Sequence, residues 1–593
     1  MYYLKGKVYV KDHQEAFGYS DGNEAENYLL QVMEETSDLG IGSEHLARAI
    51  RDWPSMYHLS PQRADLLRPF AAFLEGKSVL EIGSGCGAIT RYLGETAASV
   101  VGVEGSARRA AITAERCRDL PGVTVVQDNF DSFQWEGAFD VVTLIGVLEY
   151  SNLFIPGVGS STRLLERAGA FLRKGGVLLV AIENKLGSKY WAGAPEDHTG
   201  KAYYGLENRY TGDTAVTYGK EELRTLLEGA GFPQAQFFFP FPDYKLPTVI
   251  LREGHLNLPG FNVANLLMPN ADYVQEKPYR ASFSLPLLLK QLVPNKLVGE
   301  LANSFLVAAT MQGPAPEVVP AGTLGYAYSS QRLRPYAKEN RFVREAGGQI
   351  SVQRRRLHPG LPPLEDPWIR QYVEGEGYLE GDIHFLRFIE IVSTPGWSLA
   401  QLAAWAWPYC ALLRGLADKE GSLEGRFVDA TPFNTMGQGD KLSLFDLEWE
   451  VRERLPLRYV LFRGIYYCFV RVNAFQAPAE GTPLQVFALV EALLDMLLPD
   501  GAGNALEGFV EREGRYFPGI HYNGHGEPTD WSLPVERDEN EQLIARLREE
   551  NERFRELTLW YRRTYETRSW AGLLLTRLGA DWKASLGRGK NNR

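Results

Sequence analysis

A glycine-rich turn follows the apolar run 77–83 and precedes the helical segment 88–95. Glycine lets a chain bend sharply and come close to a ligand. The pattern is Gly-x-Gly-x-Gly at Gly83, Gly85 and Gly87. It lacks the third glycine of a dinucleotide fingerprint and the Lys-Ser/Thr pair of a phosphate loop. The turn therefore predicts a ligand site that is neither of these two standard types.

Acidic residues stand near the ends of the apolar runs around this turn. Glu81 lies two residues before Gly83, and Glu104 ends the next run. A carboxylate about 20 residues beyond such a turn can accept hydrogen bonds from both ribose hydroxyls. A third run leads to Asp128, whose carboxylate can accept from the exocyclic amine of adenine. Together these residues predict a site for an adenine nucleoside.

Five apolar, β-branched runs alternate with amphipathic segments between residues 64 and 250. The predicted strands are 77–83, 99–105, 123–129, 139–146 and 176–184, and the predicted helices include 88–95, 107–119 and 162–173. Such alternation implies parallel strands joined by right-handed crossovers. Runs that are apolar throughout imply burial on both faces of the sheet. The fold class is therefore α/β, with a doubly wound, Rossmann-like sheet, and 302–310 is a further strand candidate.

These motifs resemble the class I S-adenosylmethionine-dependent methyltransferase family over residues 64–250. The resemblance implies that the glycines lie under the methionine part of S-adenosylmethionine, that Glu104 holds the ribose and that Asp128 reads adenine. The residues predicted to bind this cofactor are Glu81, Gly83, Ser84, Gly85, Gly87, Glu104, Gly105, Asp128, Asn129 and Ile145. Two alternatives are a generic nucleotide-fold sheet whose acids only cap helices, and a site for NAD.

A polar loop after the fifth run supplies candidates for the chemistry of the methyl acceptor. Methyl transfer needs the nucleophile in line with the methyl carbon, and a hydroxyl nucleophile usually needs a base. His198 is the predicted general base, with Asp197 as its catalytic partner and Glu196 beside it. The alternative is a solvated loop. Aromatic residues nearby could form a platform for a sugar: Trp191, Tyr203, Tyr204 and Tyr210.

Three further stretches are similar to a bacterial subgroup of these methyltransferases that is associated with surface-polysaccharide glycosyltransferases. They are residues 52–61, 86–91 and 242–248. The resemblance implies a sugar or glycan hydroxyl as acceptor, in the biosynthesis of lipopolysaccharide O-antigen or a related polysaccharide. It also implies a glycosyltransferase as a partner.

A second constellation lies between residues 427 and 449. Asp429, Asn434 and Asp446 resemble the catalytic and metal-binding loops of protein-kinase-like and aminoglycoside-phosphotransferase-like folds. By that resemblance, Asp429 would orient or deprotonate a hydroxyl, while Asn434 and Asp446 would hold magnesium on the phosphates of ATP. The segment 371–377 would be the hinge of this α+β domain, and 347–357 a hairpin of its small lobe.

The kinase-like pattern is incomplete. Residues 322–345 contain no glycine-rich loop, the strand at 350–357 lacks the phosphate-anchoring lysine (Arg354 could replace it), and no histidine precedes Asp429 at the usual place. The alternatives are a degenerate lobe that binds a glycan or a partner, and an unrelated α+β domain that uses Asp429 to Pro432 as a turn. Three hypotheses follow. The chain is a methyltransferase alone, a bifunctional kinase–methyltransferase similar in layout to those that cap O-antigen chains, or a scaffold that recruits glycosyltransferases.

Composition limits the partners and the location. The formal net charge of the 593 residues is -11, which argues against a general nucleic-acid binder. The four cysteines are far apart, without zinc or redox spacing, as expected for a reducing cytoplasm. No apolar run reaches the roughly 18 residues of a membrane span, and the N-terminus lacks a signal-peptide core. We expect a cytoplasmic protein, with the inner face of the membrane as a further place of contact.

The sequence predicts seven segments. They are an N-terminal helical cap (1–60), the methyltransferase domain (61–312), a linker (313–322), the kinase-like domain (323–500), a loop region (501–535), a coiled-coil helix (536–568) and a basic amphipathic tail (569–593). The helix could pair with a partner or a second copy, or lie on its own domain. The tail could lie on an anionic membrane surface, or be a disordered basic end.

Overall fold

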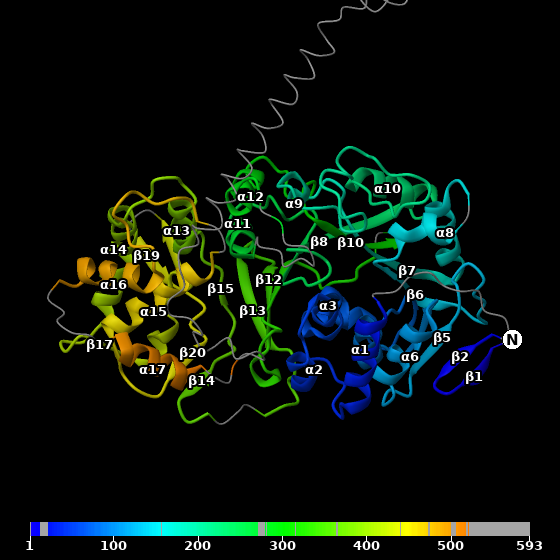
Figure 1. The fold of residues 1–593 in the computed structure, drawn as a ribbon, viewed down its shortest axis with the longest axis horizontal. Helices are drawn as coiled ribbons and strands as arrows, with labels where there is room; N and C mark the ends of the chain where they lie inside the picture. Colours follow the sequence, from blue (N-terminus) through cyan, green and yellow to red (C-terminus); the bar gives the residue numbers. More distant parts are fainter. Residues whose placement is uncertain are drawn as a thin grey trace, which may run out of the picture. The chain divides into compact units, whose positions relative to one another are not determined.

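The computed structural model describes most of the chain before residue 521 (Figure 1). The described residues are 2–11, 22–155, 157–270, 279, 281–314, 316–362, 366–438, 441–472, 475–499, 506–517 and 520. One compact unit comprises residues 1–483 and 487–531, and a second comprises 484–486 and 532–593. The predicted coiled-coil helix and basic tail, and most of the predicted loop region, lie outside the described residues.

A parallel sheet forms the centre of the first unit. Its strands follow one another in the order β5 (Val123–Gln127), β4 (Ser99–Glu104), β3 (Ser78–Ile82), β6 (Phe139–Ile145) and β7 (Leu172–Glu183). These are the five predicted strands. Their β-branched residues are buried almost throughout in β3 and β6, as a sheet covered on both faces requires. The α/β class with a Rossmann-like parallel sheet is confirmed.

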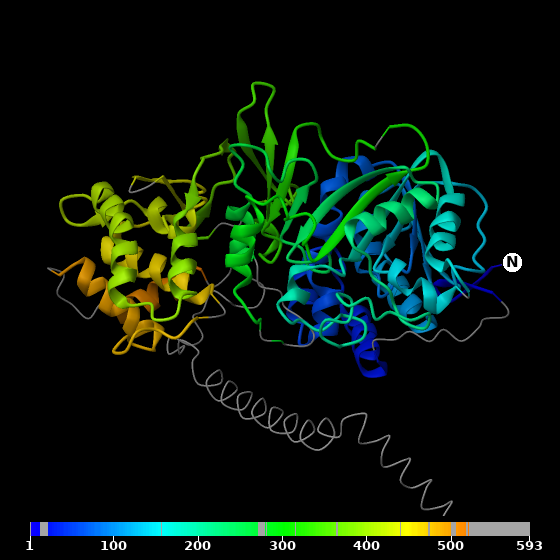
Figure 2. The same cartoon turned by 90° about the horizontal axis from the view of Figure 1, so that it is seen from above.

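Helices follow these strands along the chain, as the alternation predicted. They are α5 (Ala88–Thr96) after β3, α6 (Ala107–Arg116) after β4 and α8 (Ser160–Ala170) before β7. Further helices between residues 61 and 312 are α4 (Ala71–Leu74), α7 (Ser151–Phe154), α9 (Ser188–Trp191), α10 (Lys220–Gly229), α11 (Ala264–Leu267) and α12 (Leu285–Leu292). Figure 2 shows helices on both sides of the sheet. Because the strands are parallel, their carboxyl ends meet at one edge of the sheet.

The sheet continues beyond β7 with antiparallel strands. They follow in the order β10 (Ser304–Thr310), β8 (Gln234–Phe241), β9 (Val249–Arg252), β11 (Thr323–Tyr328), β12 (Lys338–Arg344), β13 (Ile350–Arg356) and β15 (Glu376–Gly377). The strand predicted at 302–310 is confirmed as β10. The predicted linker 313–322 lies between β10 and β11, yet β11 pairs with β9. The sheet thus crosses the predicted boundary between the two domains.

The N-terminal segment differs from the predicted helical cap. Helices α1 (Asn23–Glu35), α2 (Glu44–Arg48) and α3 (Trp53–Leu59) are present, but a hairpin of β1 (Tyr3–Lys5) and β2 (Val8–Val10) precedes them. β2 pairs with β5 in parallel and extends the sheet. The physical reason is the alternation of buried and exposed side chains along β2, which places two valines against α6 and β5.

The described residues from 369 onward are mainly helical. The helices are α13 (His384–Val392), α14 (Leu399–Leu416), α15 (Leu457–Val470), α16 (Val486–Leu497) and α17 (Leu506–Tyr516). Short antiparallel strands accompany them: β14 (Ile369–Gln371) with β20 (Trp449–Val451), β16 (Asp382–Ile383) with β18 (Thr435–Gln438) and β19 (Lys441–Leu444), and β17 (Ser422–Leu423) with β21 (Leu455–Pro456). This arrangement is α+β, as predicted for the region. Whether the region is related to kinases depends on the arrangement of its predicted catalytic and metal-binding residues.

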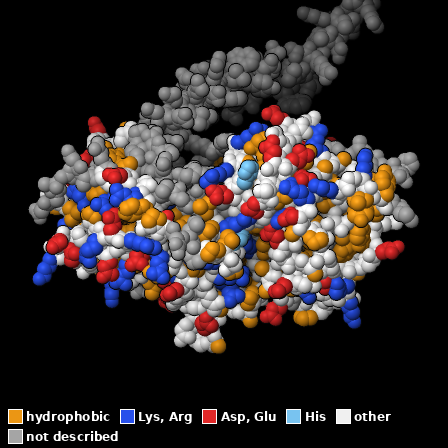
Figure 3. Space-filling view, turned by 90° about the horizontal axis from the view of Figure 1, so that it is seen from below, with side chains coloured by type: hydrophobic (Ala, Val, Ile, Leu, Met, Phe, Trp, Pro, Cys, Tyr) orange, Lys and Arg blue, Asp and Glu red, His pale blue; other side chains and the backbone are white. Residues whose placement is uncertain are grey.

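The surface and the helix lengths bear on the expected partners. Figure 3 shows basic and acidic side chains interspersed over the face that it draws, and not a single basic field. Within the described part of the chain, no helix is both long and apolar enough to cross a membrane.

Candidate active site

The glycine turn between β3 and α5 has a backbone that only glycine adopts easily. Gly83, Gly85 and Gly87 have φ angles of 76°, 58° and 78°. A Cβ atom at Gly83 would lie 2.6 Å from Cγ2 of Val147, and one at Gly87 would lie 3.0 Å from Cα of Thr113. The turn is therefore packed on its inner side, and its glycines are required by both the dihedral angles and the space.

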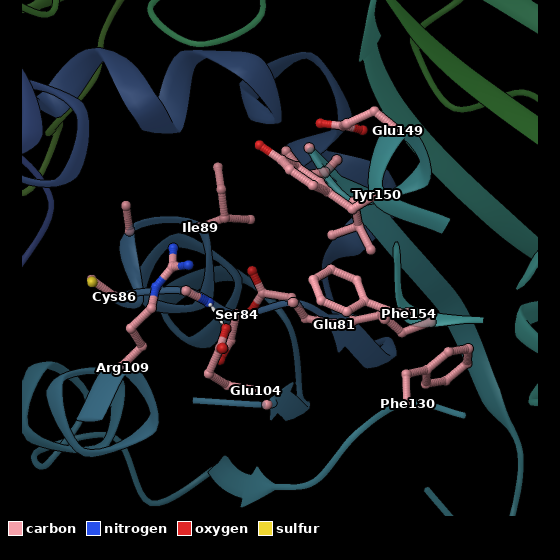
Figure 4. A pocket seen from close by; sticks show the side chains of 18 of the residues that line it. Glu81, Ser84, Cys86, Ile89, Glu104, Arg109, Phe130, Glu149, Tyr150 and Phe154 are labelled. Carbon is pink, nitrogen blue, oxygen red and sulfur yellow. Dashed lines mark hydrogen bonds between the residues drawn. The ribbon is translucent and has the colours of Figure 1, made fainter. Parts of the chain in front are cut away.

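Glu104, at the end of β4, fixes this turn. One carboxylate oxygen accepts a hydrogen bond of 2.8 Å from the backbone N–H of Gly85 (Figure 4). The other accepts one of 2.9 Å from the backbone N–H of Ser106. The side chain is buried. Each carboxylate oxygen can accept more than one hydrogen bond. Glu104 can thus hold the turn and still accept from a ligand hydroxyl.

Glu81 gives the floor of the site a buried carboxyl group. Burial, more than any other cause, raises the pKa of this carboxyl to about 8, and the nearby Glu104 carboxylate adds to the shift. Among the described residues, its Oε2 has no hydrogen-bond partner. A positively charged ligand would stabilise this carboxylate. The sulfonium of S-adenosylmethionine is such a group, so the residues present fit the predicted cofactor.

Asp128, the predicted adenine acceptor, already has three partners in the chain. The Nζ of Lys11 lies 2.5 Å from Oδ2, the Tyr2 hydroxyl donates to the same oxygen, and the Ser132 hydroxyl donates to Oδ1 at 2.9 Å. The N-terminal hairpin thus reaches the site, which the sequence did not indicate. An adenine amine would have to share this carboxylate.

A cavity of about 450 Å³ opens at the carboxyl ends of β3, β4, β6 and β7. This is within the range of small-molecule sites. The predicted residues that line it are Glu81, Gly83, Ser84, Gly85, Glu104, Gly105, Asp128, Asn129, Ile145, Asp197 and His198. Gly87 is not in its lining and instead precedes α5 as the N-cap. The structure therefore joins the predicted cofactor residues and the predicted base in a single cavity.

Several lining residues were not predicted. They are Trp53, Tyr57, His58, Arg63, Arg109, Glu149, Tyr150, Phe154, Glu183, Tyr244 and Lys245, among others. Figure 4 shows Glu149 and Tyr150 on the opposite side of the cavity from Glu104 and Arg109. Glu183 is the last residue of β7, and Glu149 lies just beyond β6. Glu149 and Glu183 could have been predicted from their positions at the ends of parallel strands, because such strand ends meet at one edge of the sheet.

Asp197 lies in a buried ion network and does not contact His198 in any described interaction. The Nζ of Lys189 is 2.9 Å from carboxylate oxygens of both Asp197 and Asp243, and that of Lys245 is 3.1 Å from Asp197. Burial alone would raise the pKa of Asp197, but the two lysines hold it well below its usual range. The predicted pairing of Asp197 with the base is therefore corrected: Asp197 anchors lysines.

Glu196 takes the role predicted for Asp197. Its Oε1 lies 2.8 Å from Nδ1 of His198, and its Oε2 accepts from the backbone N–H groups of His198 and Thr199. The Nε2 of His198 faces Glu149, 3.9 Å from Oε1. Burial lowers the pKa of His198, but the carboxylates of Glu183, Glu196 and Glu149 outweigh it and raise the pKa to about 9. The imidazole is thus charged at neutral pH while the cavity holds no other cation.

The predicted aromatic platform does not reach the cavity. Trp191 and Tyr203 are about half exposed, at 52% and 45%. Tyr204 is buried and contacts Tyr210 edge to face, with ring centroids 5.5 Å apart. The cavity is lined instead by Trp53, Tyr57, Tyr150 and other aromatic residues.

The structure also brings the second constellation together. The side-chain amide of Asn434 donates to the backbone oxygens of Asp429, at 3.0 Å, and Asp446, at 3.2 Å. The Nζ of Lys338 and Nη2 of Arg354 lie 3.0 and 3.1 Å from Oδ1 of Asp446. Arg354 was the predicted replacement for the missing lysine. Lys338, on the neighbouring strand β12, is a lysine at this site that the sequence pattern did not indicate.

Glu448 extends this second cluster. Arg332 donates to both of its carboxylate oxygens, at 2.8 and 3.0 Å, and Lys338 lies 3.1 Å from one of them. Its backbone N–H donates to Oδ2 of Asp429. Burial, followed by the charges of Glu448 and Asp446, raises the pKa of Asp429 to about 7. Asp446, a predicted magnesium ligand, and the neighbouring Glu448 are thus already paired with Lys338, Arg354 and Arg332.

Comparison with known proteins agrees with the first site. A family model described as "Methyltransferase domain" matches residues 55–234, which contain the glycine turn, Glu104 and His198. The match shows that this part of the chain is similar to a methyltransferase domain. A search of curated proteins finds no match to the sequence.

Solved structures with similar folds include three methyltransferases. One is a possible histamine N-methyltransferase from Thermotoga maritima, with 18% identity over 43% of this chain and 92% of that chain, and a TM-score of 0.26. The N-methyltransferase NodS from Bradyrhizobium japonicum, in complex with S-adenosyl-L-homocysteine, has 18% identity over 26% and 78%, with a TM-score of 0.21. Phosphoethanolamine N-methyltransferase 2 from Haemonchus contortus, in complex with S-adenosyl-L-methionine, has 18% identity over 42% and 52%, with a TM-score of 0.26. At such TM-scores these likenesses carry no argument, and the assignment rests on the family match.

Proposed function

We propose that the chain is an S-adenosylmethionine-dependent methyltransferase that O-methylates a sugar or glycan during the biosynthesis of bacterial cell-surface polysaccharide. One observation carries the proposal. The glycine turn, the Glu104 clamp and the buried carboxyl of Glu81 line the same cavity as His198. A donor site and an acceptor site are thus continuous within the matched methyltransferase domain.

The residues of the donor end have separate tasks. S-adenosylmethionine supplies an electrophilic methyl group on a sulfonium. The turn at Gly83 and Gly85 lets the backbone approach the ligand, and Glu104 keeps that turn in place through two hydrogen bonds. Glu81, ionised beside the sulfonium, attracts its positive charge from a buried position, where electrostatic attraction is stronger than in water.

The acceptor end supports a hydroxyl as the methyl acceptor. In the simplest form of the proposal, the positive sulfonium in the same cavity favours the neutral imidazole. Nε2 of neutral His198 then takes up the proton of the hydroxyl, while Glu196 fixes the ring through Nδ1. The stretches that suggest a polysaccharide context, 52–61 and 242–248, contribute Trp53, Tyr57 and Lys245 to the cavity wall. The resemblance and the site therefore concern the same residues.

Transfer of a labelled methyl group tests this function. The full chain is incubated with methyl-labelled S-adenosylmethionine and with glycans extracted from the envelope of its host. We expect the label to appear in a carbohydrate fraction, as an alkali-stable methyl ether. Label in no glycan fraction, from a protein that binds the donor, would contradict a sugar acceptor. Label in an amine would point to N-methylation.

A second candidate is phosphoryl transfer at the cluster of Asp429, Asn434 and Asp446, which would make the chain a bifunctional kinase–methyltransferase. The observation in its favour is the convergence of these residues with Lys338, a lysine in contact with a predicted metal ligand. The observation against it is the occupation of Asp446 and Glu448 by Lys338, Arg354 and Arg332. If this region binds no nucleotide, the remaining hypothesis for it is a scaffold that binds a glycan or a partner.

Measuring the binding of ATP with magnesium decides between a phosphotransferase and a scaffold. If the cluster is active, the native chain binds the nucleotide, and Asp446→Ala weakens binding by about tenfold or more, since a metal-bridging carboxylate is lost. Glu420→Ala, at an exposed position in the same region, is the matched control and should bind as the native chain does. Titration by calorimetry measures all three. Native protein that binds no ATP would exclude phosphoryl transfer here.

Partners and location belong to the same proposal. We propose that the chain works in the cytoplasm or at the inner face of the membrane, next to a glycosyltransferase, and that its C-terminal segment provides self-association or peripheral contact. The predicted helix and tail carry this part, and flotation with anionic liposomes, with and without residues 566–593, tests the membrane contact.

A further inference from the structure

We infer that the acceptor end of the cavity is a divalent-cation site, with Glu149, Glu183 and His198 as ligands. The inference deepens the proposed function and rests on it in one respect: the cation would hold an oxygen of the acceptor. Three residues from separate parts of the chain supply one ligand atom each, and these atoms all lie within 4.8 Å of one another.

Regular elements hold two of the three ligands. Glu183 is the last residue of β7, in the middle of the sheet, and Glu149 lies in the short helix Leu148–Tyr150 that directly follows β6. Both are almost completely buried, with exposed fractions of 0% and 1%. Strand ends of this kind place ligands with little freedom, as a metal site requires.

Each of the two carboxyl groups has one buried oxygen atom without a hydrogen-bond partner among the described residues. These atoms are Oε2 of Glu149 and Oε2 of Glu183. Two buried carboxylates next to each other repel, and an isolated buried charge is strongly unfavourable. A cation between them would stabilise both, so the missing partner is one that carries positive charge.

His198 has the surroundings of a metal ligand. A histidine that binds a metal through one ring nitrogen usually hydrogen-bonds a carboxylate or a carbonyl through the other. Glu196 occupies that second position at 2.8 Å from Nδ1, and Nε2 faces Glu149. Likewise, Lys245 contacts Oε1 of Glu183, and Oε2 has no hydrogen-bond partner among the described residues. The outer partners thus fix the orientation of two ligands.

Charge balance in the surrounding network agrees with a divalent ion. The network contains five carboxyl groups but only two ammonium groups and the imidazole: Glu149, Glu183, Glu196, Asp197 and Asp243 against Lys189, Lys245 and His198. If all five carboxyl groups are ionised and the imidazole is charged, two negative charges remain in excess. One divalent cation that displaces the imidazole proton leaves an excess of one.

The ligand types select the kind of ion. Carboxylate oxygens without a thiolate suit Mg²⁺ and Mn²⁺, and the one imidazole nitrogen favours a transition-metal ion such as Mn²⁺ over Mg²⁺. All three residues line the cavity, so the ion would keep open positions toward it. An acceptor hydroxyl bound there would release its proton to water in the cavity more easily because of the charge of the ion. His198 would then act as a ligand rather than as the base.

Binding of Mn²⁺ to the full chain, stripped with a chelator, tests the inference. Electron paramagnetic resonance of free Mn²⁺ should show one ion bound per chain. Glu149→Gln keeps the shape of the side chain and should weaken Mn²⁺ binding by at least about tenfold, since it removes one anionic ligand. His198→Gln should weaken it as well. Glu207→Gln, at an exposed position, is the matched control and should bind Mn²⁺ as the native chain does.

A parallel titration with S-adenosylhomocysteine separates this inference from the proposed function. If the native chain binds S-adenosylhomocysteine but no Mn²⁺, the cation site is excluded and the methyltransferase remains. Mn²⁺ bound equally by the native chain, Glu149→Gln and His198→Gln also excludes the site. If Mn²⁺ binds as expected but S-adenosylhomocysteine does not, the site stands and the proposed function falls.

Discussion

Replacing Glu104 by alanine is expected to reduce the affinity for S-adenosylhomocysteine by about 100-fold or more. The carboxylate accepts two backbone hydrogen bonds, from Gly85 and Ser106. Each hydrogen bond to a charged group contributes about 1.5–3 kcal/mol, so their joint loss would release the glycine turn. The predicted acceptor for the ribose hydroxyls would be lost with it. Isothermal titration calorimetry of the native and variant chains measures the difference.

Two further variants make this result specific. Glu104→Gln keeps one oxygen acceptor and should fall between the native chain and Glu104→Ala. Glu136→Ala removes an exposed carboxylate from the same domain and should leave the affinity unchanged. If Glu104→Ala bound S-adenosylhomocysteine as tightly as the native chain, the ligand would not lie against this turn.

The second large effect is expected at His198. The variant His198→Ala should lower methyl transfer by about 100-fold or more, since a positioned acid–base group typically contributes 10²–10⁴-fold. Both roles open to this residue, proton acceptor and ligand of the inferred cation, need Nε2 near Glu149. The affinity for S-adenosylhomocysteine should stay within about twofold of the native value, because the glycine turn and the Glu104 clamp do not involve His198. The labelled-methyl assay and calorimetry measure the two quantities.

His45→Ala is the matched control for this variant. His45 lies at an exposed position in α2 and does not line the cavity. It should lose neither methyl transfer nor ligand binding. Native rates of transfer in His198→Ala would remove His198 from the mechanism and would leave Glu149 and Glu183 as the polar groups at the acceptor end.

The parallel sheet was predictable because its strands are apolar throughout. The runs that became β3, β4, β5, β6 and β7 are buried on both faces, and helical segments separate them. The hairpin β1–β2 was not predicted, since its strands are only three residues long and β1 is exposed throughout. The continuation of the sheet through β11 was also missed, because a segment rich in proline and glycine before it indicated a domain boundary.

The donor end of the site was predictable for a different reason. Gly83, Glu104 and Asp128 follow successive parallel strands, and the topology brings such strand ends together. The acceptor end depends on contacts distant in sequence, such as that of Lys245 with Glu183. No spacing encodes these contacts. The choice of Glu196 over Asp197 as the partner of His198 depends on the turn that Glu196 closes with two backbone N–H groups.

Calorimetric titration of the full chain with S-adenosylhomocysteine tests the central claim most directly. The cavity at the glycine turn should bind one molecule per chain, with saturable heat, and the same titration with NAD should give none. The absence of heat with S-adenosylhomocysteine, or saturable binding of NAD in its place, would contradict the account.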